Sequence, residues 1–187
     1  LELYADSAKE LSKGTVDPET GKVTYVFELR DNLKWSDGSA LTAEDFVYAW
    51  NRAVDPKTAA DYAYMFDIID REVTYTENAD KSGMYDYDDE TKEYVEAKAD
   101  DKGKYHGAYD KNIKLNVTAS EDGKTLTVVI MNECTYFYEL LAFPTYMPVK
   151  KDIVDAKPDS WATDPKTYVG NGPYVMSEWV HNSKIVY

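Results

Sequence analysis

The chain has 187 residues, of which 35 are acidic and 21 are basic, so its formal net charge at pH 7 is −14. This length suits one domain that buries most of its apolar surface. The excess of acidic side chains argues against binding to nucleic acids or anionic membranes, because both attract basic protein surfaces.

The first 22 residues are polar and contain few structural signals. Asp17, Pro18 and Gly21 predict a turn, and a short helix is expected near 8–11. In the next stretch, 25–30, Tyr, Phe and Leu alternate with Val, Glu and Arg, which predicts a strand with one buried face.

A tight turn and a capped helix follow this strand. Asp37 and Gly38 favour the turn, since Asp tolerates turn geometry and Gly reaches positive φ. Thr42 is suited to cap the helix, with Asp45 as the acidic member of a capping box. Pro56 ends it. The expected apolar stripe consists of Ala43, Phe46, Val47, Trp50, Ala53 and Val54.

The middle of the chain changes character twice. Residues 59–69 are rich in aromatic side chains and fit either a short helix or an irregular segment. Residues 70–112 contain 13 acidic, seven basic and six tyrosine side chains, with very few aliphatic ones. Such a composition cannot build a large core of its own, so we expect this acidic, Tyr-rich stretch to lie on the surface.

The last third predicts short elements of both kinds. A hairpin is expected from 113–117 and 126–131 around Asp122 and Gly123, and a second one lies around His181 and Asn182. Short helices are predicted at 135–143 and 151–156. Together these elements indicate an α+β fold with short mixed or antiparallel sheets and peripheral helices.

Several motifs, in one order, resemble extracellular solute-binding proteins of family 5, the oligopeptide-, dipeptide- and nickel-binding proteins of ABC importers. The motifs are Lys34-Trp35-Ser36-Asp37-Gly38, Thr42-Ala43 with Asp45-Phe46, Thr58-Ala59 with Tyr62-Ala63, Tyr136-Phe137-Tyr138, and Asn171-Gly172-Pro173-Tyr174 before Trp179. Each motif is weak alone, but their shared order makes coincidence a poor explanation. The resemblance covers about residues 20–187. It implies a shorter connection where residues 70–112 lie, so this acidic, Tyr-rich stretch is expected to be an insertion on the surface.

The resemblance implies a two-lobed α/β architecture of the type II periplasmic binding proteins. Residues 1–187 would then be a single partial domain from the N-terminal lobe, without the C-terminal lobe. The implied function is to bind peptides between the lobes and deliver them to the membrane permease, outside the cytoplasm, without catalysis or a cofactor. The chain begins without Met and ends inside a predicted strand, so we expect a piece of a longer, exported protein, periplasmic or lipid-anchored.

The same resemblance points to two ligand-binding residues. In relatives that bind oligopeptides, the tyrosine that matches Tyr62 lines the cleft, and the residue before the proline that matches Pro144 can also face it. This residue is Phe143 here, whereas some relatives have His, so polar recognition at this position is in doubt. Trp50 lies on the apolar stripe of the helix and is expected to be structural.

Other site chemistry has less support. Residues 78–89 match a calcium-binding loop imperfectly, with Asn at position 1 and Asp at position 12. One Cys and two distant His residues form no zinc pattern, and Cys134 is expected to be a buried small hydrophobic residue. The acidic residues single out no pair for glycoside hydrolysis.

Two alternatives to peptide transport remain open. The chain could belong to a relative that binds another solute, such as a metal chelate, a sugar or a signalling peptide. It could instead be a surface adhesion module that uses the Tyr-rich insertion, which a deletion of 75–108 would distinguish.

Overall fold

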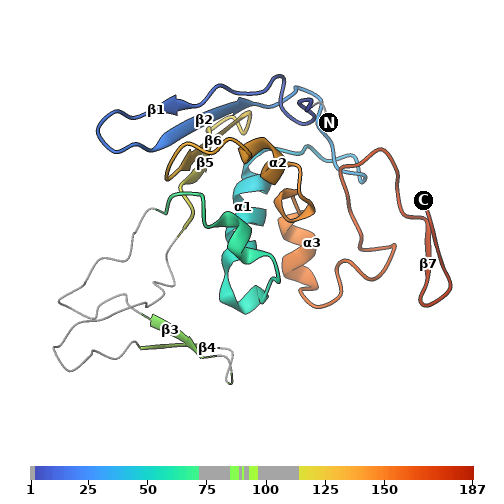
Figure 1. The fold of residues 1–187 in the computed structure, drawn as a ribbon. Coiled ribbons are helices and arrows are strands. Elements are labelled where there is room, and N and C mark those ends of the chain that lie inside the picture. The colour runs from blue at the N-terminus through green and yellow to red at the C-terminus, as the bar shows by residue number, and fades with distance from the viewer. Residues whose placement is uncertain (1–2, 72–84, 89, 91–92, 97–113) are drawn as a thin grey trace.

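The computed structural model describes residues 3–71, 85–88, 90, 93–96 and 114–187 (Figure 1). Its centre is a four-stranded sheet in the order β1-β2-β6-β5, in which all pairings are antiparallel. The strands are β1 (Thr15–Val16), β2 (Val23–Glu28), β5 (Val117–Ala119) and β6 (Thr125–Ile130). Helices α1 (Ala43–Val54), α2 (Phe137–Leu141) and α3 (Lys151–Ala156) lie on one side of it (Figure 1). The predicted α+β architecture is therefore confirmed.

The core forms where the alternating side chains of β2 and β6 meet in register. Val23 is opposite Ile130, Tyr25 is opposite Val128, and all four side chains are buried. This pattern is the one that alternation at 25–30 predicted, since every second side chain of a strand faces the same side. From α2, Phe137 packs against Tyr25 with 4.7 Å between ring centroids.

Helix α1 begins as its sequence predicts and fixes the helical layer on the sheet. The backbone N–H of Thr42 donates a 2.8 Å hydrogen bond to the Asp45 carboxylate, which is one half of the capping box. The N–H of Ala43 donates to the carbonyl of Gly123 in the turn between β5 and β6, also at 2.8 Å. The helix start is thus attached to the β5–β6 hairpin. Trp50 is only 2% exposed, in agreement with its predicted structural role.

The Ser36-Asp37-Gly38 turn connects three distant parts of the chain. The N–H of Ser36 donates to the carbonyl of Gly170 at 2.8 Å. Asp37 forms an ion pair with Lys150, just before α3. Hydrogen bonds from Lys150 and Ser39 lower the pKa of Asp37 to about 2. The turn thus holds the C-terminal segment and α3 against the body of the fold.

The structure contradicts one local prediction and decides another that the sequence left open. Residues 8–11 form no helix; Ala8 instead makes a β-bridge to Leu29, because this segment runs beside the end of β2. Two short 3₁₀ helices follow α1: η1 (Pro56–Thr58), and η2 (Ala63–Phe66) within the aromatic stretch 59–69. A third, η3 (Pro144–Tyr146), follows α2.

Both predicted hairpins are present. Gly123 adopts a φ of 68° between β5 and β6, and Asn182 a φ of 62° between β7 (Glu178–Val180) and β8 (Lys184–Val186). Within the predicted insertion, β3 (Tyr85–Asp88) and β4 (Glu93–Glu96) pair as a two-stranded antiparallel sheet. In the described part of the chain, no helix has the length and apolar character that crossing a membrane requires.

Candidate functional site

Three aromatic side chains from two distant segments form an exposed cluster, which we call the aromatic shelf: Tyr62, Tyr64 and Phe143. The rings of Tyr62 and Phe143 meet at 5.1 Å between centroids, with an angle of 61° between their planes. Tyr64 lies 6.2 Å from Tyr62. Tyr62 is 47% exposed and Tyr64 61% exposed, so both rings offer a face to the solvent.

Local backbone structure explains how these rings are presented. Tyr62 caps η2, and its carbonyl accepts a hydrogen bond from the N–H of Met65 at 3.1 Å. Phe143 lies between α2 and η3, where Pro144 starts a new turn with its fixed φ. Short, hydrogen-bonded turns therefore hold the shelf, rather than long loops.

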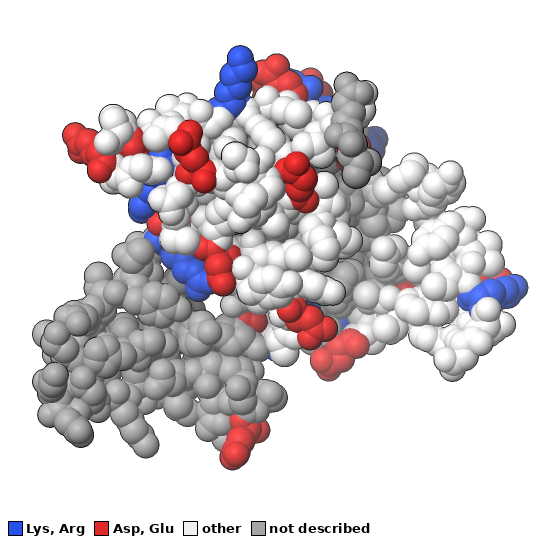
Figure 2. Space-filling model, in the orientation of Figure 1, with Lys and Arg blue, Asp and Glu red and all other residues white. Residues whose placement is uncertain are grey.

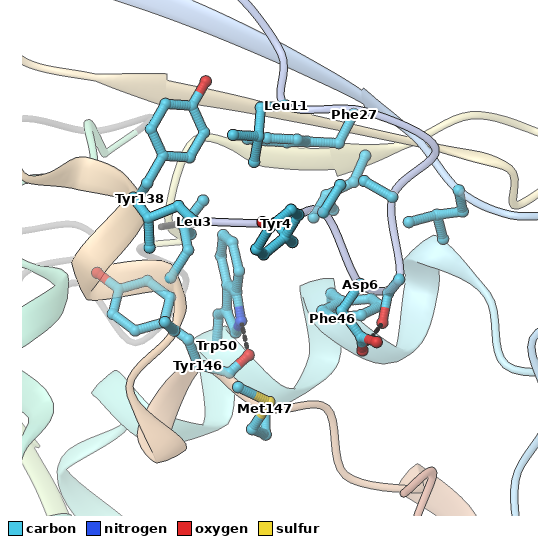
Figure 3. A pocket seen from close by; sticks show the side chains of 17 residues that line it. Leu3, Tyr4, Asp6, Leu11, Phe27, Phe46, Trp50, Tyr138, Tyr146 and Met147 are labelled. Carbon is cyan, nitrogen blue, oxygen red and sulfur yellow. Dashed lines mark hydrogen bonds between the residues drawn. The ribbon is translucent and has the colours of Figure 1, made fainter. Parts of the chain in front are cut away.

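Beneath the shelf, three buried aromatic residues join the two segments. Phe66 and Tyr146 lie 4.3 Å apart, and Trp50 lies 5.1 Å from Tyr146. The indole N–H of Trp50 donates to the Tyr146 carbonyl at 2.8 Å, as Figure 3 shows. The Tyr146 hydroxyl donates to the carbonyl of Met65 at 2.7 Å, and burial raises the pKa of this hydroxyl. Both turns thus rest on a rigid base.

The shelf offers binding chemistry rather than catalytic chemistry. Aromatic rings give large flat contact areas at low cost in conformational entropy, and tyrosine adds a hydroxyl that can donate or accept a hydrogen bond. Among the described residues, none forms a hydrogen bond with the hydroxyl of Tyr62 or Tyr64.

The structure brings the two predicted ligand-binding residues, Tyr62 and Phe143, into contact; their role in binding stays a prediction. Tyr64 was not predicted. The sequence did contain a relevant pattern, since Tyr62 and Tyr64 are separated by a single residue. Without the 3₁₀ conformation of η2, however, nothing indicated that both rings would be exposed.

The other candidate sites remain untested or fit a structural role. The calcium-loop candidate at 78–89 lies outside the described residues, apart from the backbone of 85–88. Among the described residues, no group of three or more His, Cys, Asp or Glu side chains could hold a metal ion. Cys134 is a free, half-buried thiol that packs against the core. His181 lies in the β7–β8 turn and contacts the carbonyl of Thr163.

Charge on the surface is mixed. Figure 2 shows acidic and basic side chains interspersed over the visible face of the described residues, without a continuous basic area. A nucleic-acid backbone would require such an area.

Comparison with known proteins assigns the chain to a family. The family model of bacterial extracellular solute-binding proteins, family 5 middle region, matches residues 6–187. The chain belongs to this family. The resemblance drawn from the sequence motifs is thereby confirmed.

Relatives of this family 5 chain include both peptide and non-peptide binders by name. It is 37% identical over 163 residues to the oligopeptide-binding protein OppA of Bacillus subtilis, covering 87% of this chain and 24% of that protein. It is also 37% identical over 166 residues to the probable deoxycholate-binding periplasmic protein YgiS of Escherichia coli, covering 88% of this chain and 25% of that protein. The chain thus spans about a quarter of the length of the curated relatives it matches.

Solved structures agree on the architecture. OppA of Burkholderia pseudomallei matches with a TM-score of 0.64 and 28% identity, over 97% of this chain and 28% of that one. OppA of Listeria monocytogenes bound to peptide matches with a TM-score of 0.62 and 28% identity, over 93% of this chain and 27% of that one. The family 5 chain therefore has the fold of one part of a two-lobed binding protein.

Proposed function

We propose that this chain is part of the N-terminal lobe of an extracytoplasmic receptor that binds peptides and delivers them to the permease of an ABC importer. The observation that carries the proposal is the similarity to oligopeptide-binding proteins along almost the whole chain. The receptor binds without chemical change, is periplasmic or lipid-anchored, and has an acidic, Tyr-rich insertion at about 70–112.

In this proposal the aromatic shelf forms one wall of the peptide cleft. Tyr62 and Phe143 supply a preformed apolar surface, because buried side chains already hold their backbone in place. A preformed surface loses little entropy when a ligand binds. The second lobe supplies the opposite wall, and peptide contacts from both lobes favour the closed state over the open one.

The experiment is a calorimetric titration of the complete receptor, expressed from the reading frame that encodes this chain, with a mixture of short peptides and then with single peptides. We expect saturable binding in the complete receptor and at least a hundredfold weaker binding by residues 1–187 alone, because the chain supplies one wall only. A complete receptor that binds no peptide would refute the proposal, and submicromolar binding by the chain alone would refute the two-wall arrangement.

A second candidate ligand follows from one relative. The protein named as a probable deoxycholate-binding protein is as similar to this chain as the oligopeptide-binding protein of Bacillus subtilis. An aromatic shelf can also contact the apolar face of a steroid. The same titration with deoxycholate separates the two: competition between deoxycholate and peptide would place both in one cleft, and binding of deoxycholate alone would replace the peptide proposal.

A further inference from the structure

A pocket of about 370 Å³ lies under the N-terminal segment 3–11, and Trp50 and Tyr146 from the base of the shelf form part of its wall (Figure 3). Its walls come from the sheet, from α1, and from α2 with η3, while residues 3–8 and Leu11 form its roof. None of the predicted or proposed ligand-binding residues of the shelf lines it.

The surface that lines this pocket is mostly apolar. The aromatic walls are formed by Phe27, Phe46, Trp50, Tyr138 and Tyr146. The three that have a polar atom already use it elsewhere: Trp50 donates to the Tyr146 carbonyl, Tyr146 donates to Met65, and Tyr138 donates to the carbonyl of Ser12. Figure 3 shows the Tyr146 hydroxyl directed away from the pocket. An anionic ligand would find no partner on these walls to offset its desolvation.

The roof is held in place by protein contacts and does not depend on a ligand. The guanidinium of Arg30 donates to the carbonyls of Ala5 at 3.0 Å and Ala8 at 3.3 Å, and the backbone N–H of Arg30 donates to Ser7. The segment is thus attached to the end of β2. Its side chains leave the volume of about 370 Å³ below them open.

One acidic group lies at the rim. Asp6 is exposed, and among the described residues its carboxylate has a single contact, a 3.4 Å hydrogen bond from the Ser7 hydroxyl. Asp6 lines the pocket together with Phe46 (Figure 3). A negative charge at this position, on a chain with a net charge of −14, disfavours entry of anions.

We propose that this pocket is a second binding site, for a small uncharged aromatic molecule of about two fused rings. Pockets of this size with mostly apolar walls are typical of small-molecule sites. An apolar cavity of about 150 Å³ already binds benzene, so the larger volume here accommodates two rings. The site is separate from the peptide cleft, and its occupancy does not depend on the proposed function.

The test uses the 187-residue chain with indole and the uncharged fluorescent probe N-phenyl-1-naphthylamine. We expect saturable binding of the probe, displacement by indole, and displacement by indole-3-acetate that is at least tenfold weaker because of the rim charge. In a nitrogen–proton NMR spectrum, indole should shift the Trp50 Nε1–H resonance more than that of Trp179, which does not line the pocket. This measurement requires no variant.

Two substitutions fill the pocket from opposite sides: Ala142→Phe from the end of α2 and Leu11→Trp from the roof. Each should weaken probe binding at least tenfold. Val16→Trp, at an exposed position in β1 of similar exposure to Leu11, is the matched control and should leave binding unchanged. Circular dichroism verifies the fold of each variant. No saturable binding, binding unchanged in the folded filled variants, or equal displacement by indole-3-acetate would each overturn the proposal.

Discussion

The ring of Phe143 stands against the ring of Tyr62 at 5.1 Å, at an angle typical of an edge-to-face pair, and both belong to backbone turns that Tyr146 holds together from below. Tyr62 therefore presents its free face in a fixed orientation. Removing either ring changes the shape of the same surface, which makes the pair a clear test of the aromatic shelf.

Tyr62→Ala in the complete receptor should weaken peptide binding about tenfold, which corresponds to about 1.4 kcal/mol. Exposed aromatic anchors commonly dominate binding energy, and this ring is preorganised. Phe143→Ala should have a similar effect. The double variant should lose less binding free energy than the sum of the losses in the two single variants, since the two rings are in contact. Calorimetric titration measures each affinity.

The control is Tyr136→Ala, which removes an exposed tyrosine near the other end of α2. Its affinity should match that of the unaltered receptor. If all single variants bind peptide equally well, the shelf does not face the ligand.

Tyr64 extends the shelf, and its two features can be separated. Tyr64→Phe retains the ring and loses the hydroxyl, whereas Tyr64→Leu retains an apolar side chain and loses the flat face. If the ring stacks on peptide side chains, Tyr64→Phe should retain affinity and Tyr64→Leu should lose about threefold to tenfold, as expected for one aromatic contact of about 0.5 to 1.5 kcal/mol. The reverse order would indicate that the hydroxyl makes the contact.

The sequence predicted local features well where one residue type has a single structural use. The capping pair Thr42 and Asp45 and the Gly123 turn occur as predicted, because a helix start and a positive φ each demand particular side chains. The helix predicted near 8–11 was wrong. Ala8 forms a β-bridge to Leu29 instead, and this tertiary pairing overrides a weak helix propensity.

The candidate site was only partly predictable for the same reason. Tyr62 and Phe143 were predicted as ligand-binding residues from the family resemblance, and no local sequence pattern indicated that their side chains are in contact. Their contact is tertiary: the two segments are far apart in the sequence and are joined by a hydrogen bond from the Tyr146 hydroxyl to the Met65 carbonyl. Tyr64 was missed because its exposure follows from the 3₁₀ geometry of η2.

Trp50→Phe should destabilise the chain by about 1 to 3 kcal/mol, because it leaves the buried Tyr146 carbonyl without the indole N–H. Urea unfolding monitored by circular dichroism measures the change. Trp179→Phe, a half-buried side chain in the exposed β7–β8 hairpin, is the matched control and should cost less than about 0.5 kcal/mol. Equal losses in the two variants would contradict a special role for the Trp50 hydrogen bond.

Asp70 should make stability depend on pH below about 4. Burial alone would raise its pKa, but hydrogen bonds from Asn116 at 3.0 Å and Lys22 at 2.8 Å outweigh burial and lower it below 3.8. A lowered folded-state pKa means that this stabilisation is complete above the unfolded pKa and is lost as the pH falls through the folded one.

The measurement compares Asp70→Asn with the unaltered chain by urea unfolding at pH 7 and at several values below 4. At pH 7 the variant should be less stable by about 1.5 to 3 kcal/mol, the usual range for hydrogen bonds to a charged group. The difference should shrink as the pH falls. Asp31→Asn, in an exposed ion pair with Lys124, should change stability by less than about 1 kcal/mol. A difference for Asp70 that does not vary with pH would contradict the role of its charge.

Alanine substitutions at three glycines can distinguish the cost of backbone strain from the cost of steric contact at Gly123, in the β5–β6 turn. Gly123 has a φ of 68°, and a Cβ there would lie 3.1 Å from the Cβ of Thr42. Gly21 has a φ of 74° with open space around it, and Gly172 has open space without a positive φ. Gly172→Ala should therefore be nearly neutral, and Gly21→Ala should cost about 1 to 2 kcal/mol from the left-handed conformation alone.

Gly123→Ala should cost more than Gly21→Ala, because Thr42 must also move and the hydrogen bond from Ala43 to the Gly123 carbonyl attaches this turn to α1. Urea unfolding midpoints of the three variants test this order, and equal losses for Gly21 and Gly123 would show that the contact with Thr42 relaxes without cost.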